Sequence, residues 1–321
     1  MRTTRRYAFI CNPGSRGRHS EADIGRITAR ARRLGLMYES RFTNTLDDAR
    51  VFSEEQNAAG TDVVVAVGGD GTINQVINGF YDQTGKRRGR SILGVIYTGT
   101  SPDFCRSYGI PLNHDKALDL LIRAPRRPVN VGSIVSGRTG AFDRDEPRRF
   151  FACCANIGLG ASLARMANSG IRGRIGDVAG TFVSLLRLLR TFRPLSLRLR
   201  CDDKLLRFDN AVNVSVGKTY HIASGIKCRH RLTPNDNRFY VMAVGNISAA
   251  TLIPCFVALY TGRIPGRRVP WVSLTYARRI EVERAGEEIE VECDGDPVGT
   301  EARCIEQAQE PIDLICEPTP C

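Results

Sequence analysis

The 321-residue sequence lacks a long hydrophobic run. A membrane-spanning helix needs about 20 consecutive apolar residues, and the most evident apolar stretch, residues 253–260, already contains Pro254. The basic amino terminus has a five-residue apolar stretch before Asn12 and Pro13. A secretory signal peptide usually needs about 7–15 such residues. We therefore expect a protein without spanning helices that remains in the cytoplasm.

Several motifs of common enzyme classes are also missing. The eleven cysteines show no paired C-x-x-C spacing, so neither a zinc ribbon nor a disulfide framework is indicated, and we expect reduced thiols. The four histidines lack metal-binding spacing, and no G-x-S-x-G elbow occurs. The sequence contains no G-x-x-x-x-G-K-[ST], and no G-x-G-x-x-G follows its first predicted strand. These absences exclude the standard P-loop and argue against histidine-metal catalysis.

Positive charge is abundant and comes almost entirely from arginine. The formal net charge is +12, and lysine occurs only at positions 86, 116, 204, 218 and 227. Such a charge favours an anionic partner, either nucleic acid, a phosphorylated ligand or an acidic membrane surface. A GC-rich genome also produces an arginine bias, so charge alone selects none of these. No recognition helix or stacking-aromatic motif supports nucleic-acid binding.

The first 128 residues alternate strand and helix patterns. Strands are predicted at 6–11, 37–43, 62–67 and 91–97, and helices at 21–34, 47–59, after residue 72 and at 115–123. This alternation predicts a Rossmann-like α/β domain over residues 1–128 with a parallel sheet. A proline-bracketed stretch at 124–128 is predicted to be a linker.

Strand patterns dominate the remaining chain. They occur at 129–135, 149–155, 195–200, 207–216, 238–244, 271–276, 279–284 and 288–293, with one helical pattern at 175–192. We expect a mostly antiparallel β-sandwich domain over 129–307. The segment 308–321 is expected to complete the first domain.

The strongest chemical signal is the sequence from Gly68 to Thr72, which follows a buried strand and precedes a helix. Backbone N–H groups at such a helix N-terminus suit phosphate oxygens, and Asp70 fits if it binds a metal or orients donors. An ordinary strand-to-helix turn is the alternative. Two other turns, residues 12–17 and 99–104, also follow predicted strands. Since ligands bind at the carboxyl edge of open α/β sheets, the three turns predict one crevice.

These motifs resemble the diacylglycerol kinase catalytic-domain family, which includes sphingosine, ceramide and bacterial lipid kinases. The matching segments are N-P-G-S-R-G from Asn12, G-G-D-G-T-I-N from Gly68 and G-T-S-P-D-F from Gly99. The resemblance implies ATP and Mg²⁺ as cofactors, and nucleotide contacts by Asn12, Thr43, Gly68, Gly69, Asp70, Gly71, Thr72, Asn74, Gly99, Thr100 and Asp103. Pro102 replaces the family's usual Asn, and Gln75 its usual Glu.

A second match lies near the end of the predicted sandwich. Asp294, Gly295 and Asp296 resemble the family's D-G-E segment, with Asp296 in the position of Glu. The resemblance implies that Asp296 is the general base, assisted by Asp294. From the residues alone, Asp-Gly after a strand is equally a strong hairpin signal. Both interpretations remain open at this stage.

A structural metal site is also implied. Residues 233–238 resemble the D-G-x-L segment of bacterial members, whose Asp and neighbouring backbone carbonyls hold Mg²⁺. The corresponding ligands are Asp236 and the backbone of Thr233 and Arg238, with Asn237 in place of Gly. Asn also tolerates the left-handed conformation. The alternative is an exposed turn aspartate without a metal.

The resemblance implies an ATP-dependent kinase that phosphorylates a lipid hydroxyl, peripheral to an anionic membrane surface, and it leaves a homodimer open. Arginine-rich stretches at 87–90, 172–174, 187–193 and 263–268 could contact such a surface. Two alternatives are retained. One is an NAD kinase, since that superfamily shares the G-G-D-G-T turn, and the other is a weakly active nucleotide- or lipid-binding homologue.

Overall fold

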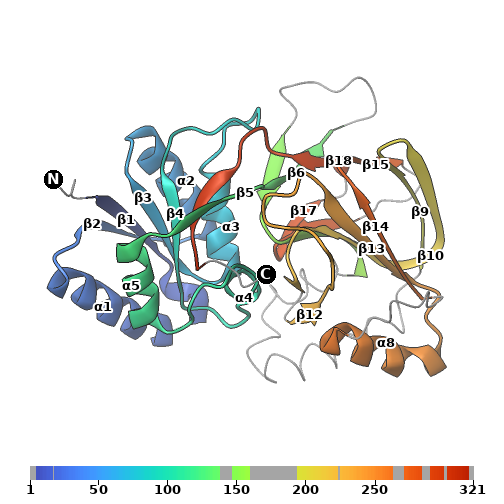
Figure 1. The fold of residues 1–321 in the computed structure, drawn as a ribbon, viewed down its shortest axis with the longest axis horizontal. Helices are drawn as coiled ribbons and strands as arrows, with labels where there is room; N and C mark the ends of the chain where they lie inside the picture. Colours follow the sequence, from blue (N-terminus) through green and yellow to red (C-terminus); the bar gives the residue numbers. More distant parts are fainter. Residues whose placement is uncertain are drawn as a thin grey trace. The chain divides into compact units, whose positions relative to one another are not determined.

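The computed structural model describes residues 5–16, 18–137, 147–159, 194–222, 225–262, 271–283, 290–299 and 302–317. The chain forms two compact units (Figure 1). The first comprises Met1–Val131 together with Ala308–Cys321, and the second comprises Gly132–Gln307. Among the described helices, none is long and apolar enough to cross a membrane.

The first unit contains a six-stranded sheet in the order β2-β1-β3-β4-β19-β5. Its strands are β1 (Arg6–Cys11), β2 (Met37–Phe42), β3 (Val63–Gly68), β4 (Ile92–Tyr97), β5 (Arg126–Val129) and β19 (Ile312–Ile315). All neighbouring pairs are parallel except β19 with β5. The prediction of a parallel, Rossmann-like sheet is confirmed.

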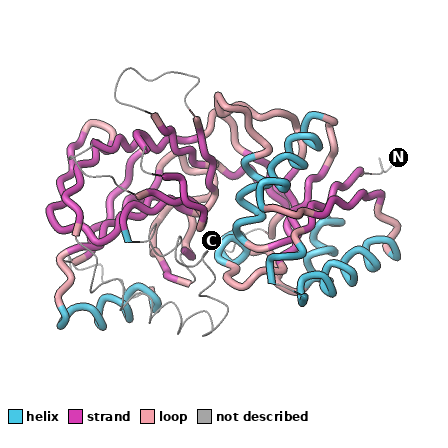
Figure 2. The backbone as a smooth tube through the Cα atoms, turned by 180° about the vertical axis from the view of Figure 1, so that it is seen from behind, coloured by secondary structure: helices cyan, strands magenta, loops and turns pink. Residues whose placement is uncertain are grey.

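Helices connect these strands, as Figure 2 shows. After the 3-10 turn η1 (Pro13–Arg16) come α1 (Arg18–Arg33), α2 (Leu46–Ala58), α3 (Asp70–Asn78), α4 (Asp103–Tyr108) and α5 (His114–Arg123). Ile24 and Ile27 of α1 and Leu118 of α5 share a core cluster with Val65 of β3. Val64, the residue next to Val65 in β3, is also fully buried. Burial of consecutive residues is expected for a parallel strand whose sheet is covered on both faces.

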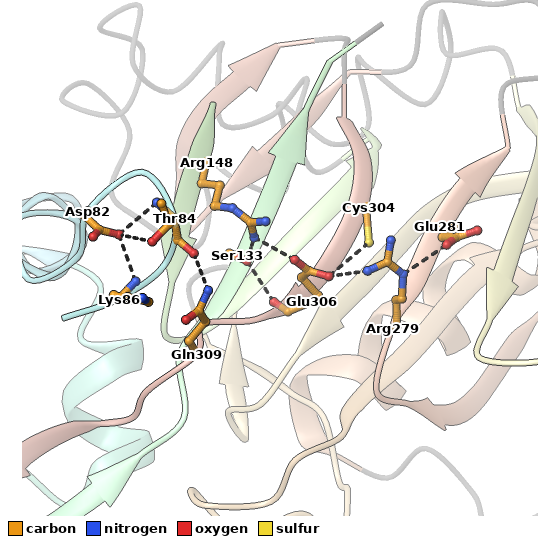
Figure 3. A network of polar contacts seen from close by, with 10 residues as sticks. All are labelled: Asp82, Thr84, Lys86, Ser133, Arg148, Arg279, Glu281, Cys304, Glu306 and Gln309. Atoms are coloured by element: carbon orange, nitrogen blue, oxygen red, sulfur yellow. Dashed lines mark hydrogen bonds and ion pairs between the residues drawn. The ribbon is translucent and has the colours of Figure 1, made fainter. Parts of the chain in front are cut away.

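The predicted linker at 124–128 is wrong, because this stretch contributes to the sheet. Arg126–Val129 forms β5 and pairs with β19. A proline in a strand removes one hydrogen-bond donor, which an edge strand tolerates, and β5 lies at the edge. The carboxy-terminal segment also contacts the loop before β4, because Gln309 Nε2 donates to the Thr84 carbonyl at 3.0 Å (Figure 3).

The second unit is built on an eleven-stranded sheet whose pairings are antiparallel. Its strands are β6 (Gly132–Ser136), β7 (Arg148–Phe151), β8 (Cys154–Gly158), β9 (Leu195–Cys201), β10 (Lys204–Gly217), β13 (Phe239–Gly245), β14 (Val272–Ala277), β15 (Ile280–Glu283), β16 (Val291–Cys293), β17 (Asp296–Gly299) and β18 (Ala302–Gln307). A short pair, β11 (His221–Ile222) and β12 (Ile226–Lys227), and helix α8 (Ala249–Thr261) complete it. The prediction of a mostly antiparallel β domain is confirmed.

The structure differs from the sequence prediction in several places, and strands β11, β12, β17 and β18 were not predicted. The single strand predicted at 149–155 is two strands, β7 and β8, separated by a bend at Ala152 and Cys153. Helix α8 was not predicted, and it begins at a capping box formed by Ser248 and Thr251. The helical pattern at 175–192 and the arginine stretches at 172–174, 187–193 and 263–268 lie outside the described residues.

A charged network joins strands of the second unit at its surface. Arg148 of β7 pairs with Glu306 of β18 at 2.7 Å, and Arg279 pairs with both Glu306 and Glu281 (Figure 3). Such half-exposed pairs contribute little stability individually. The pairs link β7 and β18 to Glu281 of β15 through Arg279, the residue before that strand.

The cysteines of the described residues are all buried and unbridged. They are Cys11, Cys105, Cys153, Cys154, Cys201, Cys228, Cys255, Cys293, Cys304 and Cys316. Burial raises the pKa of several of these thiols, for example that of Cys201 to about 11 and that of Cys255 to about 11. Since the thiolate is the reactive form, these cysteines act as small apolar core residues.

Candidate active site

The first candidate site is the turn between β3 and α3. Gly69 precedes the helix with an extended backbone, and α3 begins at Asp70. The first N–H groups of any α-helix have no partner inside the helix and favour anions. Gly68 is required sterically, because a Cβ there would lie 2.4 Å from Thr72 Oγ1. The turn therefore presents backbone donors in a shape that only glycine permits.

The structure brings the turn after β4 against this first turn. A Cβ at Gly99 would lie 2.5 Å from the Cα of Gly69 and 2.8 Å from Tyr97 Oη. The Thr98 N–H donates to the Gly68 carbonyl at 3.0 Å. Two backbones can approach this closely only without side chains between them. The close approach of the two turns therefore explains why glycine occurs at position 99.

The turn after β1 joins the same cluster through side chains. Asn12 Nδ2 donates to Thr72 Oγ1 at 2.9 Å, and Asn12 Oδ1 accepts from the Gly14 N–H at 2.9 Å. The hydroxyls of Ser15 and Thr98 are hydrogen-bonded at 2.9 Å. Three turns predicted to share one sheet edge are thus connected to one another. Thr98 was not among the predicted site residues. Its partner Ser15 lies 83 residues away in the sequence, so no local pattern could predict this contact.

The Asp70 side chain connects the two turns. Asp70 Oδ2 accepts from the Asp103 N–H at 3.3 Å, so Asp70 holds the start of α4. Asp70 was inferred from the sequence either to bind a metal or to orient donors, and this bond supports the second role.

Burial, and after it the charge of Asp70, raise the pKa of Tyr97 far above its ordinary value. The Tyr97 phenol therefore stays neutral beside the turn.

The remaining predicted nucleotide residues differ in accessibility. Thr100 is exposed. Thr43 follows β2, is buried, and donates its N–H to the Cys11 carbonyl at 2.9 Å. Asn74 is 2% exposed, and its Oδ1 accepts from Asn78 Nδ2 at 3.1 Å within α3. The Asn74 side chain is therefore engaged with its own helix. Pro102 precedes α4 and makes no side-chain cap bond.

The predicted Asp294–Asp296 segment forms the tip of the β16–β17 hairpin. Cys293 pairs with Asp296, and the two turn residues have positive φ, 49° at Asp294 and 93° at Gly295. Positive φ at both positions is typical of a type I′ hairpin turn. The hairpin interpretation is correct. It leaves the catalytic interpretation intact, because the same turn carries both carboxylates.

The carboxylate of Asp294 holds the bend between β7 and β8. Its Oδ2 accepts from the Ala152 N–H at 2.9 Å, and its Oδ1 accepts from the N–H groups of Cys153 and Cys154 at 3.0 and 2.9 Å. Three backbone donors stabilise the ionised form of a carboxylate. Protonation of Asp294 would weaken these bonds. Asp296 begins β17 and is partly exposed.

A third carboxyl group, Glu292, lies beneath this turn and was not predicted. It is 4% exposed, and its two oxygens accept from Asn156 Nδ2 and, at 2.7 Å, from the Gly295 N–H. Burial raises the pKa of Glu292 to about 8. The group is therefore protonated at neutral pH. In sequence it looks like an exposed strand residue between Val291 and Cys293, because its partner Asn156 is 136 residues away.

The turn predicted to hold a structural metal contains Asp236. Its carboxylate accepts three hydrogen bonds from Arg238, from the backbone N–H at 2.9 Å and from Nε and a terminal nitrogen at 3.0 and 2.8 Å. Its backbone carbonyl accepts from Lys218 Nζ at 2.6 Å. Burial lowers the pKa of Lys218 to about 8, so the ammonium form still predominates at neutral pH. Lysine at this turn was not anticipated from the sequence.

The two units thus carry different chemistry. The first presents a glycine-lined, N–H-rich turn suited to the phosphates of a nucleotide. The second presents a hairpin with one fixed carboxylate, one buried neutral carboxyl and one carboxylate at the start of a strand. No group of three or more His, Cys, Asp or Glu residues within the described ranges is arranged to hold a metal ion.

Family models match both units. Residues 6–134 match the diacylglycerol kinase catalytic domain, and residues 154–316 match the YegS C-terminal NAD kinase beta sandwich-like domain. A diacylglycerol kinase of Bacillus subtilis (strain 168) is 25% identical over 295 residues, covering 91% of this chain and 90% of the relative. A diacylglycerol kinase of Staphylococcus aureus (strain MRSA252) is 24% identical over 251 residues, covering 77% of this chain and 73% of the relative.

Solved structures agree at the level of the fold. A putative diacylglycerol kinase from Bacillus anthracis str. Sterne has a TM-score of 0.71 at 21% identity and covers 99% of both chains. The yeast NADH kinase complexed with NADH has a TM-score of 0.55 at 11% identity, covering 99% of this chain and 85% of that one. The matched models span both units and the curated relatives span most of the chain. The chain therefore belongs to the diacylglycerol kinase catalytic-domain family, a family of lipid kinases.

Proposed function

We propose that this protein transfers the γ-phosphoryl group of ATP to a hydroxyl group of a membrane lipid, diacylglycerol or a lipid like it. The observation that carries the proposal is the contact between the Gly69 and Gly99 turns, where an added Cβ would lie 2.5 Å from backbone. Such a bare backbone surface at a helix N-terminus suits a polyphosphate. The names of the curated relatives support the choice of acceptor.

In the proposed reaction the first unit binds MgATP. The N–H groups at the start of α3 face the phosphates, and the exposed Thr100 contacts the nucleotide. Asp70 holds the second turn in place through the Asp103 N–H. Mg²⁺ arrives with the nucleotide and neutralises the charge that develops on the transferred phosphoryl group. Phosphoryl transfer depends mainly on positioning and electrostatics, which a rigid backbone surface provides.

The second unit supplies the base. Asp296 accepts the proton of the lipid hydroxyl while the hydroxyl oxygen bonds to the γ-phosphorus, and the bond between that phosphorus and the bridging oxygen breaks so that ADP leaves. Asp294 acts as a positioning residue, since its carboxylate is committed to the backbone of residues 152–154. Glu292 stays protonated at neutral pH. One negative charge fewer beneath the turn lessens repulsion against the Asp296 carboxylate.

The acceptor side also involves a membrane. We propose that the chain associates peripherally and reversibly with anionic bilayers, supported by its net charge of +12. Each basic residue near such a surface contributes about 1 kcal/mol, and salt weakens the attraction.

The test is a transfer assay with radiolabelled ATP. The full chain is offered diacylglycerol, phosphatidylglycerol, sphingoid bases, ceramide and NAD, each in parallel with the Asp296→Asn variant. We expect label on a lipid acceptor and a loss of orders of magnitude in the variant, with little change in the apparent KM for ATP. Label on NAD alone would reject a lipid acceptor in favour of an NAD kinase. Absence of transfer despite measurable ATP binding would favour a weakly active binding homologue.

A further inference from the structure

The turn at Asp236 contains a buried positive charge where the family resemblance implies Mg²⁺. Lys218 directly follows β10 and is 4% exposed. Its Nζ donates to the Asp236 carbonyl at 2.6 Å and to the Arg238 carbonyl at 3.0 Å. The same Nζ lies 4.9 Å from the centroid of the Phe239 ring. Two carbonyls and an aromatic face together form a cation-binding environment.

The expected ligands of the metal are already in use. The Asp236 carboxylate is bound by the Arg238 side chain and backbone. Of the two backbone carbonyls in the expected ligand set, that of Thr233 accepts from the Asp236 N–H at 3.0 Å and that of Arg238 accepts from Lys218 Nζ at 3.0 Å. Mg²⁺ binds oxygen at about 2.1 Å. A Mg²⁺ ion on the Arg238 carbonyl would therefore lie within about 5 Å of the ammonium, where like charges repel strongly. The residues present do not fit a metal ion.

The Lys218 backbone extends the influence of this turn toward the catalytic hairpin. Its N–H donates to the Cys153 carbonyl at 3.0 Å. The N–H of the same Cys153 donates to the Asp294 carboxylate at 3.0 Å. Lys218 thus connects the Asp236 turn with the bend that Asp294 holds. Two residues, Lys218 and Cys153, therefore link the Asp236 turn to the hairpin that carries Asp294.

We propose that the ε-ammonium of Lys218 is a built-in cation that replaces the structural Mg²⁺ at the Asp236 turn, so that this turn folds without a metal. Lysine can do this because its single charge and three N–H donors satisfy several carbonyls at once. The long stem reaches the carbonyls from β10, and the aliphatic part is buried on the way. The inference does not depend on the transfer reaction, because it concerns stability and metal binding alone.

The first measurement uses the unmodified full chain without nucleotide. We expect its melting temperature to change by less than about 1 °C after dialysis against EDTA or on adding millimolar Mg²⁺, since binding only to the folded state would raise it. A melting temperature that falls with EDTA and recovers with Mg²⁺ would overturn the proposal. So would a Mn²⁺ site, detected by electron paramagnetic resonance, that disappears in Asp236→Asn. Neither result depends on kinase activity.

The second measurement removes the charge. Lys218→Met keeps most of the aliphatic stem and leaves the carbonyls of Asp236 and Arg238 without their cation. The loss of two hydrogen bonds donated by a charged group is costly, so we expect the melting temperature to fall by about 5 °C or more. The matched control is Lys204→Met, an exposed lysine of the same strand region. Equal melting temperatures for the two variants would refute the role of Lys218. Lys218→Ala opens space beside the carbonyls, and stabilisation of that variant alone by Mg²⁺ would support the replacement directly.

Discussion

The substitution Gly69→Ala separates the role of the glycine turn in folding from its role in binding. In the structure an added Cβ at Gly69 approaches only the Cα of Gly99, at 3.4 Å, which is ordinary van der Waals contact. The backbone there has φ −91°, which alanine adopts without strain. Alanine caps a helix less well than glycine, by up to about 1 kcal/mol. We therefore expect a folded variant whose melting temperature falls by at most about 4 °C.

Nucleotide binding should respond very differently. The new methyl would add bulk to the bare backbone at the N-terminus of α3, the surface to which the proposed function assigns the phosphates. A displacement of about 1 Å can cost on the order of a hundredfold in rate. We expect kcat/KM for ATP to fall at least that far, measured by labelled transfer beside thermal melting. Gly25→Ala in α1 is the matched control, because nothing lies within 4 Å of its Cβ. A stable Gly69→Ala variant with full activity would refute phosphate binding at this turn.

Three further predictions concern the contact between the turns, the base and the membrane. Gly99→Ala should lower stability as well as activity, because its Cβ would lie 2.5 Å from Gly69 Cα; a melting temperature equal to that of Gly69→Ala would contradict this difference. Asp296→Glu extends the base by roughly 1.5 Å. If the backbone of the turn already brings the aspartate carboxylate to the lipid hydroxyl, the longer side chain should slow turnover. Faster turnover would show that the aspartate is too short to reach the hydroxyl. Sedimentation with anionic vesicles should show binding that weakens as salt rises, and no binding at low salt would favour a soluble acceptor.

Features formed by neighbouring residues were predictable. The buried strand, glycine turn and helix around Gly68 to Thr72 follow from composition and order along one short stretch, because each part depends on local backbone preferences. The Asp294–Gly295 hairpin is predictable for the same reason. In both places the residue types also carry the family resemblance.

Features that depend on distant partners were not predictable. The stretch 124–128 resembles a linker because of its prolines, and only β19, more than 180 residues later, makes it a strand. Glu292 and Lys218 look like solvent-exposed charges, since charged residues are rarely buried unless paired. Their partners Asn156 and Asp236 come from other strands and turns. The spacing of residues along the sequence does not predict contacts between segments so far apart.

The buried Glu292 predicts how stability depends on pH. The pKa of Glu292 in the folded protein is about 8, against 4.5 for an ordinary glutamate, and burial is the main cause. The nearby Asp294 and Asp296 carboxylates also raise this pKa, whereas hydrogen bonds from Asn156 and Gly295 lower it. Between these two pH values the folded state binds one proton more than the unfolded state. The contribution is therefore fully present below about pH 4.5 and is lost as the pH rises towards 8.

Integrated over that window, the loss is on the order of 5 kcal/mol at most. It should appear as a urea midpoint that decreases steadily between pH 5.5 and pH 8.5. Glu292→Gln keeps the shape and cannot titrate. We expect this variant to lose some stability at low pH, because its amide replaces the oxygen that accepts from the Gly295 N–H at 2.7 Å. Its midpoint should then change much less with pH than that of the unmodified chain. Parallel pH profiles for the two proteins would show that Glu292 is ionised in the folded state, and that repulsion beneath the Asp296 carboxylate is not relieved by protonation.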